Sequence, residues 1–230
     1  MPDILTSALA SDGLMWIAVA AFAAGLIRGF AGFGTAMIYL PIASLYLSPV
    51  EAIVTLTVMD CLGPLPALPR AVKDADWPDL RRLILSMTLS LPLGLWLLVS
   101  VPADVFRYGV CAVSLILLAA LVLGVRYQGQ LSRSKVVGVG LSSGILGGSV
   151  GLPGPPVILF YMASSHTAQV IRDTTMVFLF SFDIILFAML GGQGILSLSS
   201  LILGAILIFP MLLGVMLGTW LFRPEYEKVY

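Results

Sequence analysis

The chain has 230 residues, of which 59% are hydrophobic and 10% are charged, and its formal net charge is zero. Its mean hydropathy of +1.05 excludes a soluble domain, which needs far more polar surface. The charge balance gives no reason to expect a nucleic acid as partner. Long apolar runs that lack the alternation of a membrane barrel predict an all-α polytopic membrane protein, with the lipid bilayer as its surroundings.

Nine apolar segments follow one another along the chain, and we expect each to be a helix. Five are long enough to span a bilayer, at about 51–68, 83–101, 108–125, 174–191 and 199–222. Four are short and come in two pairs, 14–28 with 35–48 and 136–147 with 154–165. A glycine-rich break separates the members of each pair, with the sequence RGFAGFG at 28–34 and GGSVGLPG at 147–154.

A shift of 119 residues places the first break on the second, which indicates an internal repeat. The shift matches Gly25 with Gly144, Gly29 with Gly148, Gly32 with Gly151, Leu40 with Leu159, Thr55 with Thr174 and Val58 with Val177. We expect a first repeat at 1–125, with a broken hairpin at 14–48 plus three spans, and a linker at 126–135. The second repeat is expected at 136–230, with a broken hairpin at 136–165 plus two spans. The counterpart of the span at 108–125 would begin where the sequence ends, so either a last helix has been lost or the chain continues, and we favour the second.

Lysine and arginine residues in the short connections predict which parts face the cytoplasm. The connections at 70–82 and 126–135 carry most of these residues, so both are expected to be cytoplasmic. If 136–165 enters and leaves the membrane on the same side, the two halves become inverted repeats, which is a common plan of secondary transporters. The alternative makes each broken pair one kinked span and gives parallel repeats.

The two breaks are the strongest indication of a binding site. Backbone polar groups at membrane depth need partners, so an interrupted helix is expected where the chain lines a polar cavity. The N-terminus of a helix carries a partial positive charge and unpaired N–H groups, which favour a bound anion. Two breaks that meet in the membrane would bind a small oxyanion; the alternative is that their glycines only allow close helix packing. The candidate solute-binding residues are Arg28, Gly29, Gly32, Gly34, Thr35, Tyr39, Gly148, Gly151, Gly154, Pro155 and Tyr161.

Three charged residues within apolar segments are candidates for the transport chemistry. Arg28 could bind an oxyanion through two N–H groups, or it could be an arginine that only reaches the membrane surface. Asp60 and Asp183 could each carry a coupled proton or pair with Arg28 when no solute is bound. The alternative for both is a protonated carboxyl that bonds across helices.

Histidine occurs once, at His166 in a short connection, and we expect it to be an ordinary residue of the membrane interface. With one histidine and few acidic residues, a metal cluster or a catalytic dyad is not expected, so we predict no metal, no cofactor and no enzymatic activity.

The sequence resembles the sulfite exporter TauE/SafE family over nearly its whole length. The resemblance is carried by GFAGFGTAMIYLP at 29–41, DADW at 74–77, PLG at 92–94 and GGSVGLPGPPVILFY at 147–161. The chain departs from the family pattern at Thr35 and Ala36, which replace glycines, and at Pro153, where glycine is usual. The resemblance implies a multi-pass protein of the bacterial inner membrane that transports small sulfur-containing anions or organic acids, of the sulfite, thiosulfate or sulfonate type.

The sequence therefore predicts a secondary transporter of small anions, with its site between residues 28–35 and 147–156. Proton coupling through Asp60 or Asp183 is a further hypothesis. Two other classes stay open: an intramembrane enzyme acting on lipid phosphates, and a non-transporting membrane subunit that scaffolds a partner. A homo-oligomer is compatible with each of these classes.

Overall fold

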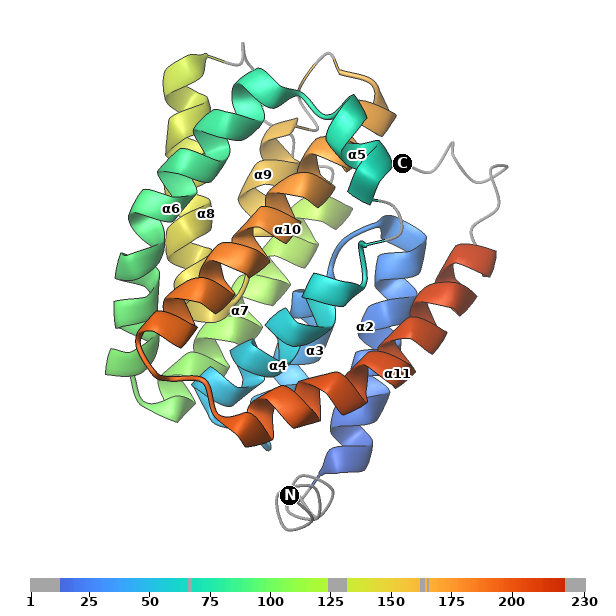
Figure 1. The fold of residues 1–230 in the computed structure, drawn as a ribbon, viewed down its shortest axis with the longest axis vertical. Helices are drawn as coiled ribbons and strands as arrows, with labels where there is room; N and C mark the ends of the chain where they lie inside the picture. The colour runs from blue at the N-terminus through green and yellow to red at the C-terminus, as the bar shows by residue number, and fades with distance from the viewer. Residues whose placement is uncertain (1–12, 66–67, 124–131, 162–163, 165, 222–230) are drawn as a thin grey trace. The chain divides into compact units, whose positions relative to one another are not determined.

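The computed structural model describes residues 13–65, 68–123, 132–161, 164 and 166–221, and within these ranges the chain forms helices and no strand (Figure 1). This confirms the predicted all-α fold. The helices are α2 (Leu14–Ala31), α3 (Thr35–Ala43), α4 (Pro49–Leu62), α5 (Leu68–Asp74), α6 (Trp77–Ser100), α7 (Ala103–Val122), α8 (Arg133–Val150), α9 (Gly154–Tyr161), α10 (Ala168–Gly192) and α11 (Leu198–Leu221).

Four of these helices, α6, α7, α10 and α11, are long and apolar enough to cross a membrane, so the chain is a multi-pass membrane protein. The predicted span at 51–68 is wrong, because α4 ends at Leu62 and is too short to cross. Gly63 and Pro64 follow it; Gly63 still has a helical conformation, and Pro64 has no N–H with which to continue the helical hydrogen bonds. The structure also contains the short helix α5, which the sequence analysis did not predict.

Three consecutive helices begin at the spacing of the proposed repeat. The first residues of α2, α3 and α4 each lie 119 positions before those of α8, α9 and α10: Leu14 and Arg133, Thr35 and Gly154, Pro49 and Ala168. The ends of α2 and α8 obey the same spacing, at Ala31 and Val150. The agreement of these helix boundaries supports the repeat, while its inversion in the membrane stays a prediction.

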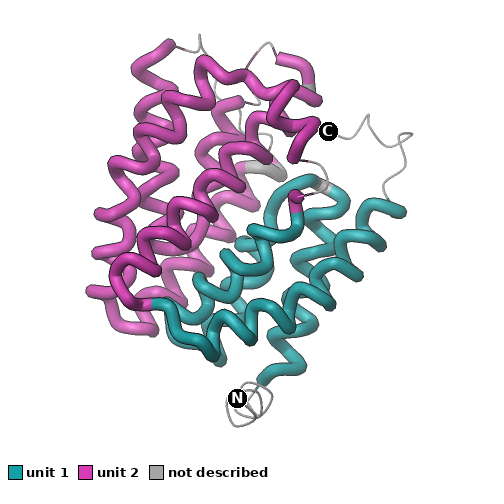
Figure 2. The backbone as a smooth tube through the Cα atoms, viewed as in Figure 1, with its two compact units in different colours: residues 1–63, 196–230 teal, residues 64–195 magenta. Residues whose placement is uncertain are grey.

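The chain divides into two compact units, and the division does not follow the two halves of the sequence (Figure 2). Unit 1 consists of residues 1–63 and 196–230, and unit 2 consists of residues 64–195. Unit 1 thus combines α2, α3 and α4 with the late helix α11. Unit 2 contains α5 to α10.

In unit 1, α2 packs closely along α11 (Figure 1). Glycines on both helices allow this close approach, because a Cβ atom at Gly25 or Gly29 would overlap the backbone of α11. A Cβ atom at Gly214 or Gly218 would likewise overlap the backbone of α2. Small residues that let two backbones approach are a recurring feature of helix pairs in membranes.

In unit 2, α8 packs along α6 in the same manner. A Cβ atom at Gly148 would lie 2.8 Å from the Cα of Gly94, and one at Gly144 would overlap the carbonyl oxygen of Met87. In the proposed repeat, α8 is the counterpart of α2 and α11 corresponds approximately to α6. Each unit therefore pairs the first helix of one repeat with the long helix of the other.

Candidate functional site

The first break joins α2 to α3 through a short turn that only glycines permit. α2 ends at Ala31 and is capped by Gly32, whose N–H donates to the carbonyl oxygen of Arg28 at 2.7 Å. Gly32 has φ of 83° and Gly34 has φ of 98°, a left-handed conformation that side chains disfavour. This turn leaves Arg28 in the last turn of α2 and Thr35 at the first position of α3.

Asp60, in the last turn of α4, receives contacts from both sides of this break. Its Oδ1 atom pairs with Nη1 of Arg28, and its Oδ2 atom accepts a hydrogen bond from Oγ1 of Thr35 at 2.8 Å. The Arg28 and Asp60 side chains are only 15% and 13% exposed. One carboxylate therefore joins α2, α3 and α4. The sequence left several roles open for Asp60, and in the structure Asp60 pairs with Arg28.

The Asp60 carboxylate lies in a position that would also suit the oxygen atom of a bound anion. It lies against the first residue of α3, the end at which a helix carries its partial positive charge. It also accepts from a guanidinium and a hydroxyl, the donor types that bind oxyanions in proteins. The site in unit 1 thus supplies a cation, a hydroxyl and a helix terminus to a negatively charged oxygen.

Tyr39 of α3 and Thr55 of α4 form a second contact between these two helices. The hydroxyl of Tyr39 lies 2.8 Å from Oγ1 of Thr55, and the Tyr39 side chain is completely buried. Oγ1 of Thr55 is also within hydrogen-bonding distance, 2.9 Å, of the carbonyl oxygen of Glu51. Tyr39 therefore has its hydrogen bond inside the protein and holds α3 on α4.

The second break, in unit 2, has a similar backbone but a different chemistry. α8 ends at Val150 and is capped by Gly151 at φ of 72°, and α9 begins at Gly154. Proline residues surround Gly154: Pro153 precedes it, and Pro155 and Pro156 follow it. Proline has no N–H to donate. The second break consequently offers fewer amide donors than a glycine-rich turn would.

The side chains at the positions equivalent to Arg28, Thr35 and Asp60 are also apolar. A shift of 119 residues places Gly147, Gly154 and Leu179 there. Cδ2 of Leu179 lies 3.3 Å from the position of a Cβ atom at Gly154, and the ring of Phe182 covers Gly147. The charged contacts of unit 1 therefore have no counterpart at this place in unit 2.

The remaining predicted residues have more varied surroundings. Gly29 and Gly148 face the backbones of α11 and α6, so the space beside them is used for helix packing. Tyr161 is the last residue of α9, about 10 Å along the helix from Gly154. Asp183 is buried in the middle of α10, with 7% exposure. No group of three His, Cys, Asp or Glu residues that could hold a metal ion lies among the described residues.

Sequence reasoning missed one set of polar contacts, which lies in unit 2. Nε2 of His166 lies 3.3 Å from Oδ2 of Asp76, and the His166 ring stacks on that of Tyr161. Asp76 belongs to the DADW stretch, which the sequence analysis noted only for its family resemblance. Nothing in the sequence near His166 or in the DADW stretch indicates that these residues come into contact in the folded chain.

The helices and the two breaks define a polytopic α-helical membrane protein with interrupted helices and a largely buried charged pair at one interruption. The sulfite exporter TauE/SafE family matches residues 17–227, and the chain belongs to this family. It is thus a member of a family of membrane transporters of sulfur anions like sulfite. No curated protein and no solved structure matches the chain.

Proposed function

We propose that the protein is a secondary transporter of small sulfur-containing or organic anions across the bacterial inner membrane, with Arg28 as the group that binds the anion. Membership of the TauE/SafE family supports transport of a small anion. We assign the site from one observation: the Asp60 carboxylate accepts hydrogen bonds from both Arg28 and Thr35. That carboxylate serves as an internal stand-in for a sulfonate or sulfite oxygen.

In this mechanism the solute and Asp60 compete for Arg28. A sulfur oxyanion that displaces Asp60 takes over the guanidinium and the Thr35 hydroxyl. Asp60 then lies in largely apolar surroundings without its cation, which is costly for a charged carboxylate. Asp60 therefore takes up a proton as the anion binds, and one proton moves with each anion.

The charges of unit 1 favour a solute with a single negative charge. Arg28 is the only lysine or arginine among the described residues of unit 1. Glu51 is engaged at the start of α4, where its carboxylate accepts from the N–H of Ser48 at 3.0 Å. A monoanion with a protonated Asp60 leaves this unit's site neutral, whereas a dianion leaves an uncompensated charge. Hydrogen sulfite and sulfonates fit this balance better than a doubly charged oxyanion.

The test is uptake of labelled sulfite and a labelled sulfonate into proteoliposomes, with and without a pH gradient. We expect Arg28→Gln to lower uptake by about 100-fold, since it removes a charged hydrogen-bond donor from a largely buried site. Asp60→Asn is expected to retain exchange of solute but to lose its dependence on the pH gradient. Arg107→Gln, which changes an exposed arginine paired with Asp104 on α7, is the matched control and should transport normally.

Folding of the variants is checked with the double variant Arg28→Gln/Asp60→Asn, which removes both charges together and leaves no unpaired ion. If this folded variant and Arg28→Gln transport as the unchanged protein does, the site is not at Arg28. If the unchanged protein moves none of the small anions, the alternative of a non-transporting membrane subunit is favoured instead.

A further inference from the structure

The guanidinium of Arg28 lies beside a glycine at the end of α4. Gly63 directly follows the last residue of α4, and a Cβ atom placed on it would lie 3.5 Å from Cζ of Arg28 and 3.7 Å from Nε. At such distances, a point in the plane of a guanidinium is closer to one of its nitrogen atoms than to its carbon atom. Because Cζ is the nearer atom here, the missing Cβ would lie over the flat face of the guanidinium, away from the N–H group that reaches Asp60.

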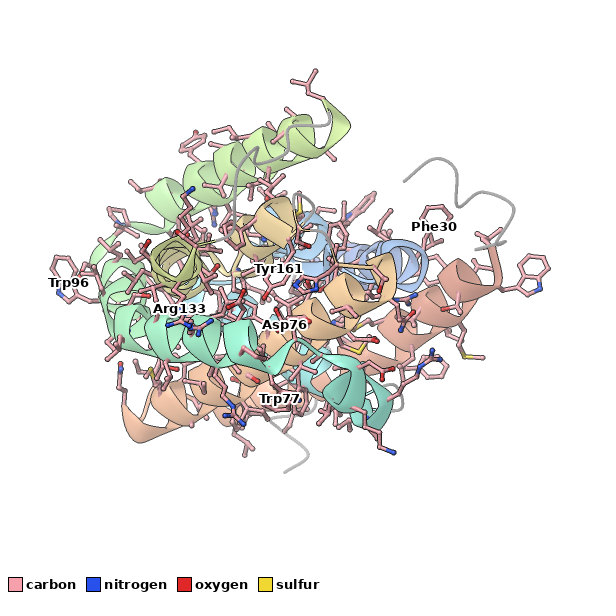
Figure 3. All side chains as sticks on the ribbon, turned by 90° about the horizontal axis from the view of Figure 1, so that it is seen from above. Phe30, Asp76, Trp77, Trp96, Arg133 and Tyr161 are labelled. Carbon is pink, nitrogen blue, oxygen red and sulfur yellow. The ribbon has the colours of Figure 1, made fainter. Side chains whose placement is uncertain are left out.

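Arg28 reaches this position from the inner side of α2. Phe30, two residues later, is 38% exposed and points away from α2 in the view from above (Figure 3). Residues two positions apart lie about 200° apart around a helix. Arg28 therefore faces the opposite way, toward α4, where Asp60 accepts its hydrogen bond.

The space over the guanidinium face is also bordered by Met211 of α11. Its Cε atom lies 3.3 Å from the position of the missing Cβ atom. The methionine side chain is unbranched and adapts readily to its neighbours. A space that one methyl group would fill, at close to ordinary contact distances, therefore lies between Arg28, Gly63 and Met211.

Gly63 differs from the glycines that allow helices to approach. A Cβ atom at Gly25 or Gly29 would overlap a neighbouring backbone, whereas one at Gly63 would not. Its φ of −58° and ψ of −46° are helical, so a left-handed conformation does not explain the glycine either. Pro64 gives one reason for it, since a Cβ atom before proline is crowded in a helical conformation. The space beside Arg28 is a second consequence of the same glycine.

We propose that Gly63 is a positioning residue for Arg28, and that the space beside it lets the guanidinium turn from Asp60 to an incoming anion. This inference rests on the proposed binding of the anion at Arg28. Exchange of Asp60 for a solute requires the guanidinium to loosen one contact as it forms the next, although its side chain is only 15% exposed. A packed interior leaves little room for such a movement, and the missing side chain of Gly63 supplies it.

The test is the effect of Gly63→Ala on the KM for uptake of labelled sulfite and labelled methanesulfonate into proteoliposomes. The added methyl group packs on the guanidinium while Arg28 is paired with Asp60, and this contact is lost when Arg28 turns. The paired state gains about as much as the burial of one methyl group, so KM is expected to rise about fourfold. Gly154→Ala is the matched control, since it also adds a methyl group to a helical residue before a proline but meets only apolar side chains of unit 2. It should change KM less than about twofold.

The double variant Gly63→Ala/Asp60→Asn separates positioning from a merely structural effect. Without the carboxylate, the guanidinium has no charged partner to leave, so the added methyl group should no longer raise KM and the two substitutions are expected to be non-additive. Should Gly63→Ala fail to fold, Met211→Leu tests the same space from α11: it conserves volume but withdraws the terminal methyl group, and KM is expected to fall.

The proposal is overturned if Gly63→Ala leaves KM in place, or if it raises KM equally with and without Asp60→Asn. An unchanged KM in Met211→Leu would also contradict it when Gly63→Ala does not fold. Absence of uptake by the unchanged protein is a different result, because it contradicts the proposed function itself and this inference with it.

Discussion

The breaks in unit 1 and unit 2 differ in chemistry although both begin with a left-handed glycine. Both follow a helix that ends with a left-handed glycine, Gly32 in unit 1 and Gly151 in unit 2. The first break has Arg28, Thr35 and Asp60 beside it, and the second has glycine and leucine at the equivalent positions. In the proposed repeat, the pair of Arg28 and Asp60 therefore belongs to only one of the two copies.

The comparison also separates two uses of glycine. Glycines on the packed faces, such as Gly29 and Gly148, allow helices to approach in both units. Glycines within the turns, such as Gly32 and Gly151, permit the left-handed conformation that ends each helix. At the breaks, both units have a left-handed glycine but different neighbouring side chains, so differences in function are expected to originate in those side chains.

The largest predicted effect tests whether the packing is the same in both units. Gly29→Ala and Gly148→Ala each place a methyl group against a neighbouring backbone, which cannot move aside as a side chain can. Each is expected to destabilise the protein by about 2–3 kcal/mol, seen as a lower thermal unfolding temperature in detergent. Gly138→Ala, also on α8 but with open space beside it, is the control and should stabilise by about 0.5–1 kcal/mol. Tolerance of Gly29→Ala alone would mean that the two helix pairs are not equivalent.

An intermediate effect sharpens the chemical difference between the breaks. Thr35→Val removes the hydroxyl that donates to Asp60 and is expected to raise the KM for transport about three- to tenfold. Gly154→Ala changes the equivalent position of unit 2, where its methyl group meets the ends of the Leu179 and Ile158 side chains, and should change KM less than about twofold. Thr35→Ser restores the hydroxyl and should recover most of the affinity. Equal effects of Thr35→Val and Gly154→Ala would contradict the assignment of the site to unit 1.

The smallest effect concerns the helices that follow the breaks. Ser48 and Glu51 form a reciprocal capping box at the start of α4, whereas Thr167 caps α10 only by accepting from the N–H of Val170. Ser48→Ala should cost about 1 kcal/mol and Thr167→Ala less, measured as faster hydrogen exchange in the first turn of each helix. Ser132→Ala, at an N-cap whose side chain makes no capping bond to the helix, should have little effect. A greater loss at Thr167 than at Ser48 would show that the capping box adds nothing.

Much of the fold could be predicted because long apolar runs and glycine breaks act locally. Every predicted segment corresponds to a helix, and each predicted break contains a helix end, although residues 28–31 and 147–150 of the breaks are still helical. The errors occurred where short-range chemistry overrides hydropathy. Gly63 and Pro64 end α4 inside an apolar run, and α5 is a single short helix that carries Arg70, Lys73 and Asp74, so its composition resembles a loop.

The site was only partly predictable because its contacts join distant parts of the chain. Arg28 and Asp60 were recognised separately from the cost of placing charge in apolar segments. The sequence could not choose between a pair and two independent groups, since 32 positions separate them. His166 and Asp76 were missed for the same reason, as neither is unusual in its own segment.

The pairing of α2 with the late helix α11 has a consequence for how the chain is made. α8 emerges from the ribosome after its partner α6, so this pair can assemble as soon as α8 enters the membrane. α2 can pair with α11 only after α11 has been synthesised, and the first residue of α11 lies about 180 positions after the first residue of α2. At about 5–20 residues per second, that interval is roughly 10–40 s. During this interval the glycine face of α2 lacks its partner α11, so we expect biogenesis to depend on how that nascent helix is protected.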